Sequence, residues 1–145
     1  MEEPSSGQIT IDAGLLGDFK GVKHKSRQIT ILALEDWNRA LGDLSVPVGT
    51  LPWTTRRANL LCEGLRLPRV KGAILDTGSI RLEVTGQTYP CRRMDEAHMG
   101  LLKALAPDWR GGVTCTVIAS GPVALGDTIR ITSSPPEPLP RKLPG

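Results

Sequence analysis

The spacing of short β-forming segments constrains the fold of this chain more than any other feature of its sequence. Residues 28–34 (Gln-Ile-Thr-Ile-Leu-Ala-Leu), 72–76 and 79–85 are rich in aliphatic and β-branched side chains, and turn-forming residues separate them. This pattern is typical of strands. The segments lack the regular alternation with long helices that a parallel sheet requires. The sequence therefore predicts a mostly β fold, a mostly antiparallel β-barrel with two or three short helices.

The same pattern predicts where the elements begin and end. Strands or extended segments are expected at residues 8–12, 28–34, 54–63, 72–76, 79–85, 110–119 and 128–132. Short helices are expected at residues 35–41 and 97–106, and turns at residues 76–79 and 121–127. Gly42 and Pro107 would end the two helices because both residue types disfavour helix continuation.

One domain accounts for the length of the chain, because 145 residues can bury a core without disulfide bonds. Residues 8–132 hold all the predicted elements. Residues 1–7 are expected to form a flexible leader. Residues 133–145 contain five prolines and are expected to form a flexible, Pro-rich tail.

The charge and the aromatic content narrow the range of partners. The formal net charge is +3, a mildly basic balance that suits a small anionic ligand such as phosphate. Nucleic-acid-binding domains usually carry a clustered basic patch or an aromatic stacking platform. One Tyr, one Phe and three Trp form a poor platform, so no nucleic-acid partner is expected.

The sequence favours a cytoplasmic protein with no membrane partner. No apolar run reaches the roughly 18–20 residues that a membrane span needs. The acidic, polar start of the chain does not resemble a secretory signal. Three cysteines without paired spacing argue against a disulfide framework and against a zinc site.

Two of the three cysteines have the sequence context of core residues. Cys62 would share a strand face with Leu60. Cys115 alternates with Val113 and Val117, which places the three side chains on one face of a strand. Both cysteines are expected to act as small buried hydrophobic residues.

Cys91 differs from the other two because it lies in a predicted loop, Tyr89-Pro90-Cys91-Arg92-Arg93, between a strand and a helix. Positive neighbours and a nearby helix N-terminus stabilise a thiolate. A thiolate is a nucleophile and a soft metal ligand. The local sequence leaves two interpretations open, a reactive cysteine and an exposed, unreactive one.

Three segments carry groups suited to a small anion. Arg57 and Asn59 would project from one face of the 54–63 segment, although a solvated strand face explains them as well. Arg110-Gly111-Gly112 combines charge with accessible N–H groups, although glycines also form ordinary turns. Gly17-Asp18-Phe19-Lys20 places a carboxylate and an amine in a permissive loop, where an Asx-type turn explains Asp18 equally.

Taken in order, these segments resemble the MOSC domain family, named after the C-terminal domain of molybdenum cofactor sulfurase. The resemblance covers about residues 8–132, and the order and spacing of the motifs carry it. The motifs are Gly14-Leu-Leu-Gly-Asp18-Phe-Lys20-Gly21, Arg27-Gln28-Ile29, Arg57-Ala-Asn59-Leu60, Gly72-Ala-Ile-Leu, Leu82-Glu-Val84-Thr85, Pro90-Cys91 with Arg93-Met94, Arg110-Gly111-Gly112, Gly121-Pro-Val123 and Gly126-Asp127-Thr-Ile129.

The resemblance implies a barrel similar to the barrel domain of pyruvate kinase. It also implies binding of the molybdenum cofactor (molybdopterin), a pterin dithiolene with a terminal phosphate. In relatives that reduce N-hydroxylated compounds, the cysteine that matches Cys91 ligates molybdenum, so Cys91 is the expected metal ligand and catalytic residue. The residues expected to contact the cofactor are Asp18, Lys20, Arg57, Asn59, Arg93, Arg110 and Gly111.

The resemblance allows three functions. The first is the catalytic component of a reductase that acts on small N-hydroxylated substrates. The second is a sulfur carrier or cofactor-delivery module, in which Cys91 holds a persulfide. The third is a binding domain without catalysis. Lys20 fits this function, because relatives often have His at that position. The sequence shows no ferredoxin-like cysteine set and no flavin motif, so a separate electron-transfer or sulfur-donor protein is expected.

Overall fold

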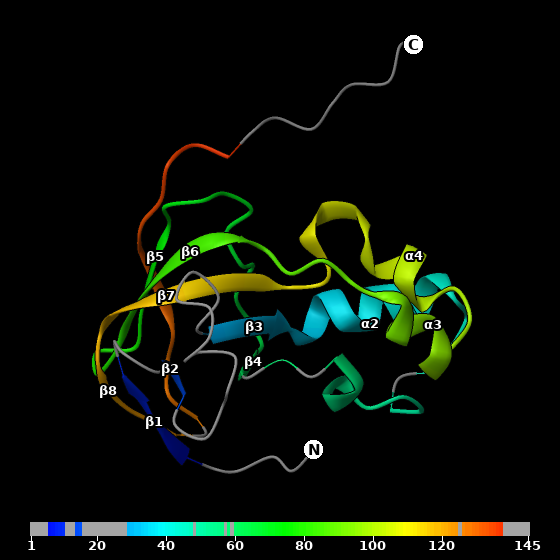
Figure 1. Ribbon diagram of the computed structural model, residues 1–145, viewed down its shortest axis with the longest axis horizontal. Coiled ribbons are helices and arrows are strands. Elements are labelled where there is room, and N and C mark those ends of the chain that lie inside the picture. Colours follow the sequence, from blue (N-terminus) through cyan, green and yellow to red (C-terminus); the bar gives the residue numbers. More distant parts are fainter. Residues whose placement is uncertain are drawn as a thin grey trace.

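The computed structural model (Figure 1) places the strands on one side of the molecule and the helices on the other. It describes residues 6–10, 14–15, 29–47, 49–56, 58, 60–124 and 126–137. Within these ranges, no helix has the length and apolar character needed to cross a membrane.

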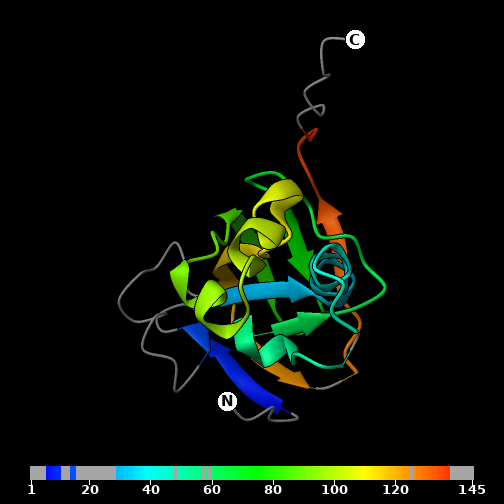
Figure 2. The same cartoon turned by 90° about the vertical axis from the view of Figure 1, so that its right-hand side faces the viewer.

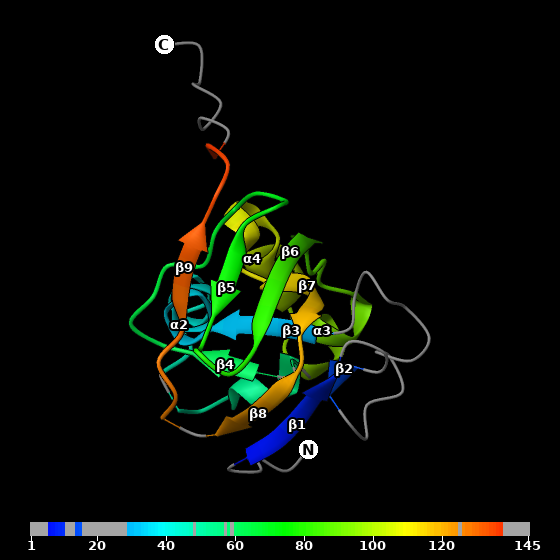
Figure 3. The same ribbon diagram turned by 90° about the vertical axis from the view of Figure 1, so that its left-hand side faces the viewer.

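The larger sheet has six strands in the order β4-β3-β7-β6-β5-β9. Their bounds are β3 (Ile29–Ala33), β4 (Leu60–Cys62), β5 (Ile74–Asp76), β6 (Arg81–Gln87), β7 (Val113–Ala119) and β9 (Arg130–Ser133). β3 and β4 are parallel, and every other neighbouring pair is antiparallel. The sheet curls into a half-barrel (Figure 3), which confirms the prediction of a mostly β, barrel-like fold.

A smaller sheet has the order β2-β1-β8, with β1 (Ser6–Thr10), β2 (Gly14–Leu15) and β8 (Gly121–Ala124). The chain passes from β7 to β8 at Gly121, where a Cβ atom would lie 2.4 Å from the carbonyl oxygen of Ser79. The prediction of a turn over residues 121–127 is therefore wrong at its start. Pairing with β1, more than a hundred residues earlier in the chain, makes this segment a strand.

Three short α-helices lie within the described residues. They are α2 (Leu34–Asp43), α3 (Arg92–Ala97) and α4 (Leu101–Leu105), and two 3-10 turns, η2 (Trp53–Arg56) and η3 (Pro107–Trp109), accompany them. Figure 2 faces the helices, and α4 contacts both α2 and α3. Glu35 and Asp36 in the first turn of α2 complement the helix dipole.

The structure buries two hydrophobic clusters. The first is built mostly by strand residues and contains Cys62 and Cys115, as their sequence context predicted. The second lies among the helices and includes Trp37, Met94 and Leu101. Leu32 of β3 belongs to this helical cluster, whereas its neighbours Ile31 and Ala33 belong to the strand cluster. Alternate residues of β3 therefore contribute to the two clusters.

The sequence predicted an extended segment over residues 54–63, and the structure contradicts this prediction at the start of the segment. Its first residues form η2, where Thr55 N–H donates to the carbonyl of Pro52, and the strand β4 is limited to Leu60–Cys62. Proline favours the start of a tight turn because its φ angle is already fixed. The local turn therefore overrides the β-forming composition.

The predicted helix over residues 97–106 is divided. α3 begins earlier, at Arg92, and ends at Ala97, and α4 begins at Leu101. Gly100 separates them with φ +89°, a left-handed conformation that glycine adopts readily. Asp95 Oδ1 accepts the Leu102 N–H at 3.0 Å and supports the start of α4.

The predicted hairpin between β5 and β6 is confirmed, but its turn lies one residue further along the chain than predicted. Thr77 N–H donates to the carbonyl of Ile80, and Gly78 has φ +91°. Asp76 accepts the Gly78 N–H, and its carboxylate pairs with Arg81. These contacts hold the pKa of Asp76 below its usual value, with the Gly78 hydrogen bond contributing most.

Candidate functional site

Cys91 occupies the N-cap position of α3, on the surface of the protein. Its backbone is extended, with φ −118° and ψ 174°, and its carbonyl accepts the Met94 N–H at 2.9 Å. The Cys91 side chain makes no capping hydrogen bond. Backbone contacts therefore fix the residue, and the helix does not use the thiol.

The pairing of β6 with β7 brings two of the predicted motifs together. Gln87, the last residue of β6, pairs with Val113, the first residue of β7. Beyond this pair, Thr88 N–H donates to the carbonyl of Gly112 at 2.8 Å. The loop that leads to Cys91 and the Arg110-Gly111-Gly112 turn therefore leave the sheet at the same end.

Packing explains the second glycine of this turn. Gly112 has φ +101°, and a Cβ atom there would lie 2.3 Å from the carbonyl oxygen of Ile31. Gly111 is buried. The close approach to β3 requires glycine at position 112, so turn geometry accounts for that part of the motif.

Arg110 joins the turn to two helices. Its Nη1 donates to Asp43 at the end of α2 and to the carbonyl of Ala104 in α4, at 3.0 Å for the second contact. Among the described residues, its buried Nε has no hydrogen-bond partner. The structure gives Arg110 a structural role, and its contact with a cofactor stays a prediction.

The first turn of α3 carries two exposed arginines, Arg92 and Arg93. In the part of the chain that the structure describes, neither side chain forms an ion pair. Their charges are therefore not neutralised by any described carboxylate in the helical turn that follows Cys91.

Large apolar side chains are exposed on the same segment of the chain. Tyr89, two residues before Cys91, is 73% exposed, and Met99, in the turn between α3 and α4, is 86% exposed. Exposed apolar groups of this size contribute to binding surfaces when they gather.

Cys62 and Cys115 have a different environment from Cys91. Both are buried, and burial raises the pKa of each thiol to about 12. Glu35 and Asp36 add to this effect at Cys62. The two buried thiols are thus kept protonated at neutral pH, whereas Cys91 lies at the surface.

The structure brings only some of the predicted site residues together. Asp18, Lys20, Arg57 and Asn59 lie outside the described residues. Ala58, between the last two, is buried in the helical cluster that also contains Met94. The preceding turn η2 contacts α3. Ala58 and η2 therefore lie close to the helix that follows Cys91.

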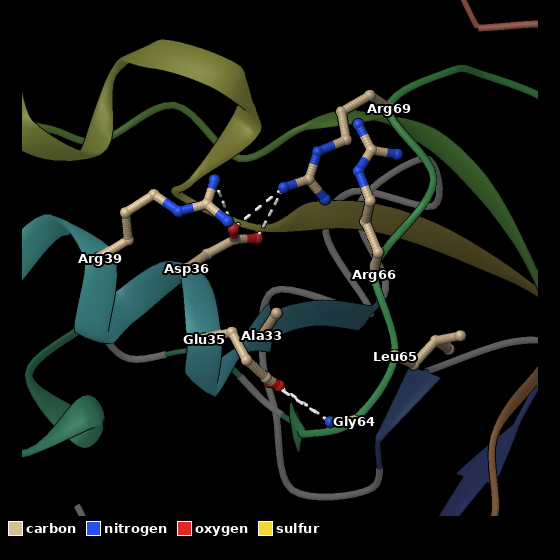
Figure 4. Close-up of a pocket in the computed structure, with 8 residues that line it drawn as sticks. All are labelled: Ala33, Glu35, Asp36, Arg39, Gly64, Leu65, Arg66 and Arg69. Carbon is tan, nitrogen blue, oxygen red and sulfur yellow. Dashed lines mark hydrogen bonds and ion pairs between the residues drawn. The ribbon is translucent and has the colours of Figure 1, made fainter.

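A pocket of about 250 Å³ lies at the start of α2, and none of the predicted site residues lines it within the described ranges. Figure 4 shows its lining residues: Ala33, Glu35, Asp36, Arg39, Gly64, Leu65, Arg66 and Arg69. Sequence reasoning did not single out this group.

A buried ion pair forms one side of the pocket. Arg69 Nη2 lies 3.0 and 2.9 Å from the two carboxylate oxygens of Asp36, and both side chains are almost fully buried. Arg69 Nη1 donates to the carbonyl of Leu67 at 2.6 Å. Asp36 precedes Trp37, which is buried in the helical cluster. In the sequence, the only indication of this pair is that the charged residue Asp36 stands next to Trp37, a residue that the fold buries.

Comparison with known proteins identifies the family. The family model described as MOSC domain matches residues 23–130. This chain belongs to the MOSC domain family. The match lies within the 8–132 region that carries the sequence resemblance, and it includes Cys91, Arg93 and Arg110.

Solved structures show the same fold. The YUAD protein from Bacillus subtilis superposes on the MOSC domain with a TM-score of 0.74 and 18% identity, over 88% of this chain and 85% of that one. YiiM from Escherichia coli gives a TM-score of 0.70 and 19% identity, over 89% of this chain but 63% of YiiM. YiiM from Geobacillus stearothermophilus gives 0.64 and 17%, over 89% of this chain and 74% of that one. No curated protein matches the sequence significantly.

Proposed function

We propose that this MOSC domain binds the molybdenum cofactor beside the β6–α3 connection and acts as the catalytic component of a reductase of N-hydroxylated compounds. Cys91 would be its metal ligand. The placement of Cys91 carries the proposal, because this thiol is exposed and makes no capping bond, and its loop leaves the sheet beside the Gly111-Gly112 turn.

The described residues fit this cofactor chemically. A cysteine sulfur is the soft ligand that suits a metal already bound through dithiolene sulfur. Arg92 and Arg93 in the adjacent helical turn are exposed and offer guanidinium groups to a pterin phosphate. Asp18, Lys20, Arg57 and Asn59 remain proposed contacts, on the strength of the family resemblance.

The proposed reaction divides the work between the cofactor and the chain. The bound cofactor would supply two-electron chemistry, so that two electrons and two protons convert an N–OH group to N–H and water. Cys91 would hold the metal at the surface, where substrate can reach it. Tyr89 and Met99 would present apolar contacts to the separate protein that delivers the electrons.

A reductase assay tests this proposal. The protein is purified from a host that makes the cofactor and assayed with a reduced viologen dye as electron donor and hydroxylamine as test substrate. We expect turnover by the wild type and none by Cys91→Ser, because serine removes the soft ligand with little change in size. Lys103→Ala, which changes an exposed cation on α4, serves as the control and should retain activity. Absence of turnover in cofactor-loaded wild type would contradict the reductase function.

Exposure of the Cys91 thiol also favours a second function, sulfur transfer. The thiolate would attack the outer sulfur of a donor persulfide. A bond forms between Cys91 Sγ and that sulfur, the donor S–S bond breaks, and the donor leaves as a thiolate. Mass spectrometry after incubation with a low-molecular-weight persulfide tests this. One added sulfur on Cys91, removable by reductant, supports the carrier role, and an unmodified thiol contradicts it.

A further inference from the structure

The C-terminal segment ends its described part in a fixed contact. Both carboxylate oxygens of Glu137 lie 2.9 Å from Nη1 of Arg66, and Oε1 also accepts the backbone N–H of Arg69 at 2.8 Å. About 70 residues of sequence separate the partners. The contact is therefore a product of the tertiary fold, and one carboxylate engages a guanidinium and a backbone amide together.

A second contact holds the same segment. Gly72 has φ +92°, and a Cβ atom there would lie 3.3 Å from Cγ of Pro135. Pro135 thus packs against the backbone of Gly72, two residues before Glu137. The segment that follows β9 is anchored at two points, and Glu137 reaches Arg66 from a defined direction.

The electrostatics agree with a seated anion. The hydrogen bond from Arg66 lowers the pKa of the Glu137 carboxyl, and the Arg69 N–H lowers it further. The same contact raises the pKa of Arg66. Glu137 is therefore held as a carboxylate at neutral pH.

The Arg69 half of the cradle that receives Glu137 is built independently of that carboxylate. Arg69 is fixed by the buried pair with Asp36 and by its bond to the Leu67 carbonyl. These contacts use its guanidinium and leave its backbone N–H pointing to Glu137. Removal of Glu137 would leave the amide in place and the Arg66 guanidinium without the carboxylate that it now binds.

The pocket adjoins this cradle because Arg66 and Arg69 also line it. Two carboxylates face the pocket as well, but both are engaged. Glu35 accepts the Gly64 N–H at 2.8 Å, and Asp36 pairs with Arg69 (Figure 4). Arg39 contacts Asp36 at 3.8 Å and Asp108 at 3.4 Å. Arg66 is thus the lining arginine whose main partner, Glu137, comes from the C-terminal segment.

We propose that Arg66 and the backbone N–H of Arg69 form a binding site for the oxyanion group of a small molecule, a carboxylate or a phosphate, and that Glu137 is the site's internal competitor. A ligand that displaces Glu137 would place its anionic group in the cradle and the rest of its structure in the adjoining pocket. Its binding would release the C-terminal segment from Arg66.

Anion titration tests the site. Inorganic phosphate and acetate are titrated separately into the full-length protein, with the Arg69 amide followed by NMR and affinity measured by calorimetry. Glu137→Ala should bind the preferred anion about fivefold or more tighter than the wild type. The second substitution in Glu137→Ala/Arg66→Ala should remove that gain. The anion with the larger gain identifies the ligand class.

Two further variants make the result decisive. Glu137→Gln removes the charge but keeps a hydrogen-bonding group, so its gain should lie between those of the wild type and Glu137→Ala. Glu96→Ala, which changes an exposed carboxylate on α3, should bind like the wild type. Equal affinity of wild type and Glu137→Ala for both anions would overturn the site. So would a gain that survives loss of Arg66.

Discussion

The β6–α3 connection and the pocket beside α2 both contain arginines, but the fold treats their charges differently. In the pocket region, Arg69 pairs with Asp36 and Arg66 with Glu137. Beside Cys91, Arg92 and Arg93 are exposed and form no ion pair with any residue that the structure describes.

This difference in ion pairing separates the two candidate sites. Paired arginines hold segments of the chain together, and a ligand must displace a carboxylate to reach Arg66. Unpaired arginines next to an exposed thiol meet no such competitor. The Cys91 region is therefore the stronger candidate for the main function. In the pocket, a ligand would compete with the Glu137 carboxylate for Arg66.

Thiol labelling should reveal the largest contrast within the molecule. In protein from a host that lacks the cofactor, iodoacetamide should modify Cys91 more than about a hundredfold faster than Cys62 or Cys115, because the buried thiols are protonated and inaccessible. Peptide mass spectrometry gives the three rates. Comparable rates for Cys91 and Cys115 would remove the distinction between exposed and structural cysteines.

Breaking the buried ion pair should have the largest effect on stability. Asp36→Ala leaves the Arg69 guanidinium buried without its main partner, at a cost of about 3 kcal/mol and a fall in Tm of roughly 10 °C. Thermal unfolding measures this. The double variant Asp36→Ala/Arg69→Met should lose less than Asp36→Ala alone. An equal or larger loss would show that the pair does not act as a unit.

The turn beside Cys91 should be the next most sensitive position. Gly112→Ala places a Cβ atom against the Ile31 carbonyl in a left-handed backbone, and we expect a loss of about 2–3 kcal/mol. Gly126 has a similar φ, +93°, but open space around it. Gly126→Ala should therefore lose only about 1 kcal/mol. Equal losses in chemical denaturation would indicate that backbone strain, and not the contact with β3, requires Gly112.

Acid should weaken the Glu137 contact by a small amount. The pKa of Glu137 is lowered in the folded protein, so its contribution is present above the ordinary value of 4.5 and is lost as the pH falls through the folded value. Glu137→Gln should lower Tm by at most about 3 °C at neutral pH, and this difference from the wild type should shrink as the pH falls below 4.5 and vanish below the folded pKa. A difference that persists in acid would mean that the carboxylate charge is not responsible.

The sequence predicted the features that depend on local patterns. Aliphatic and β-branched runs marked β3, β5, β6 and β7, and alternation with Val113 and Val117 marked Cys115 as a core residue. The turn residues around Gly78 marked the hairpin. Each of these features is decided by residues close together in the chain.

Features that depend on distant partners could not be predicted in this way. The strand at Gly121–Ala124 exists because it pairs with β1. The partner of Arg66 is Glu137, which lies in a segment that its prolines marked as a tail. The sequence predicted that Arg110 would contact an anionic ligand, and only the fold shows that its guanidinium pairs with Asp43.

Metal and pterin analysis of wild type and Cys91→Ser tests the central claim most directly. Both proteins are purified from a cofactor-producing host, with Tm measured to establish that the fold is retained. The account predicts molybdenum and pterin in the wild type, and in Cys91→Ser a molybdenum centre with one sulfur ligand fewer by X-ray absorption spectroscopy, because the dithiolene still holds the metal. A wild type that carries neither, or a Cys91→Ser variant with an unchanged number of sulfur ligands, would contradict it.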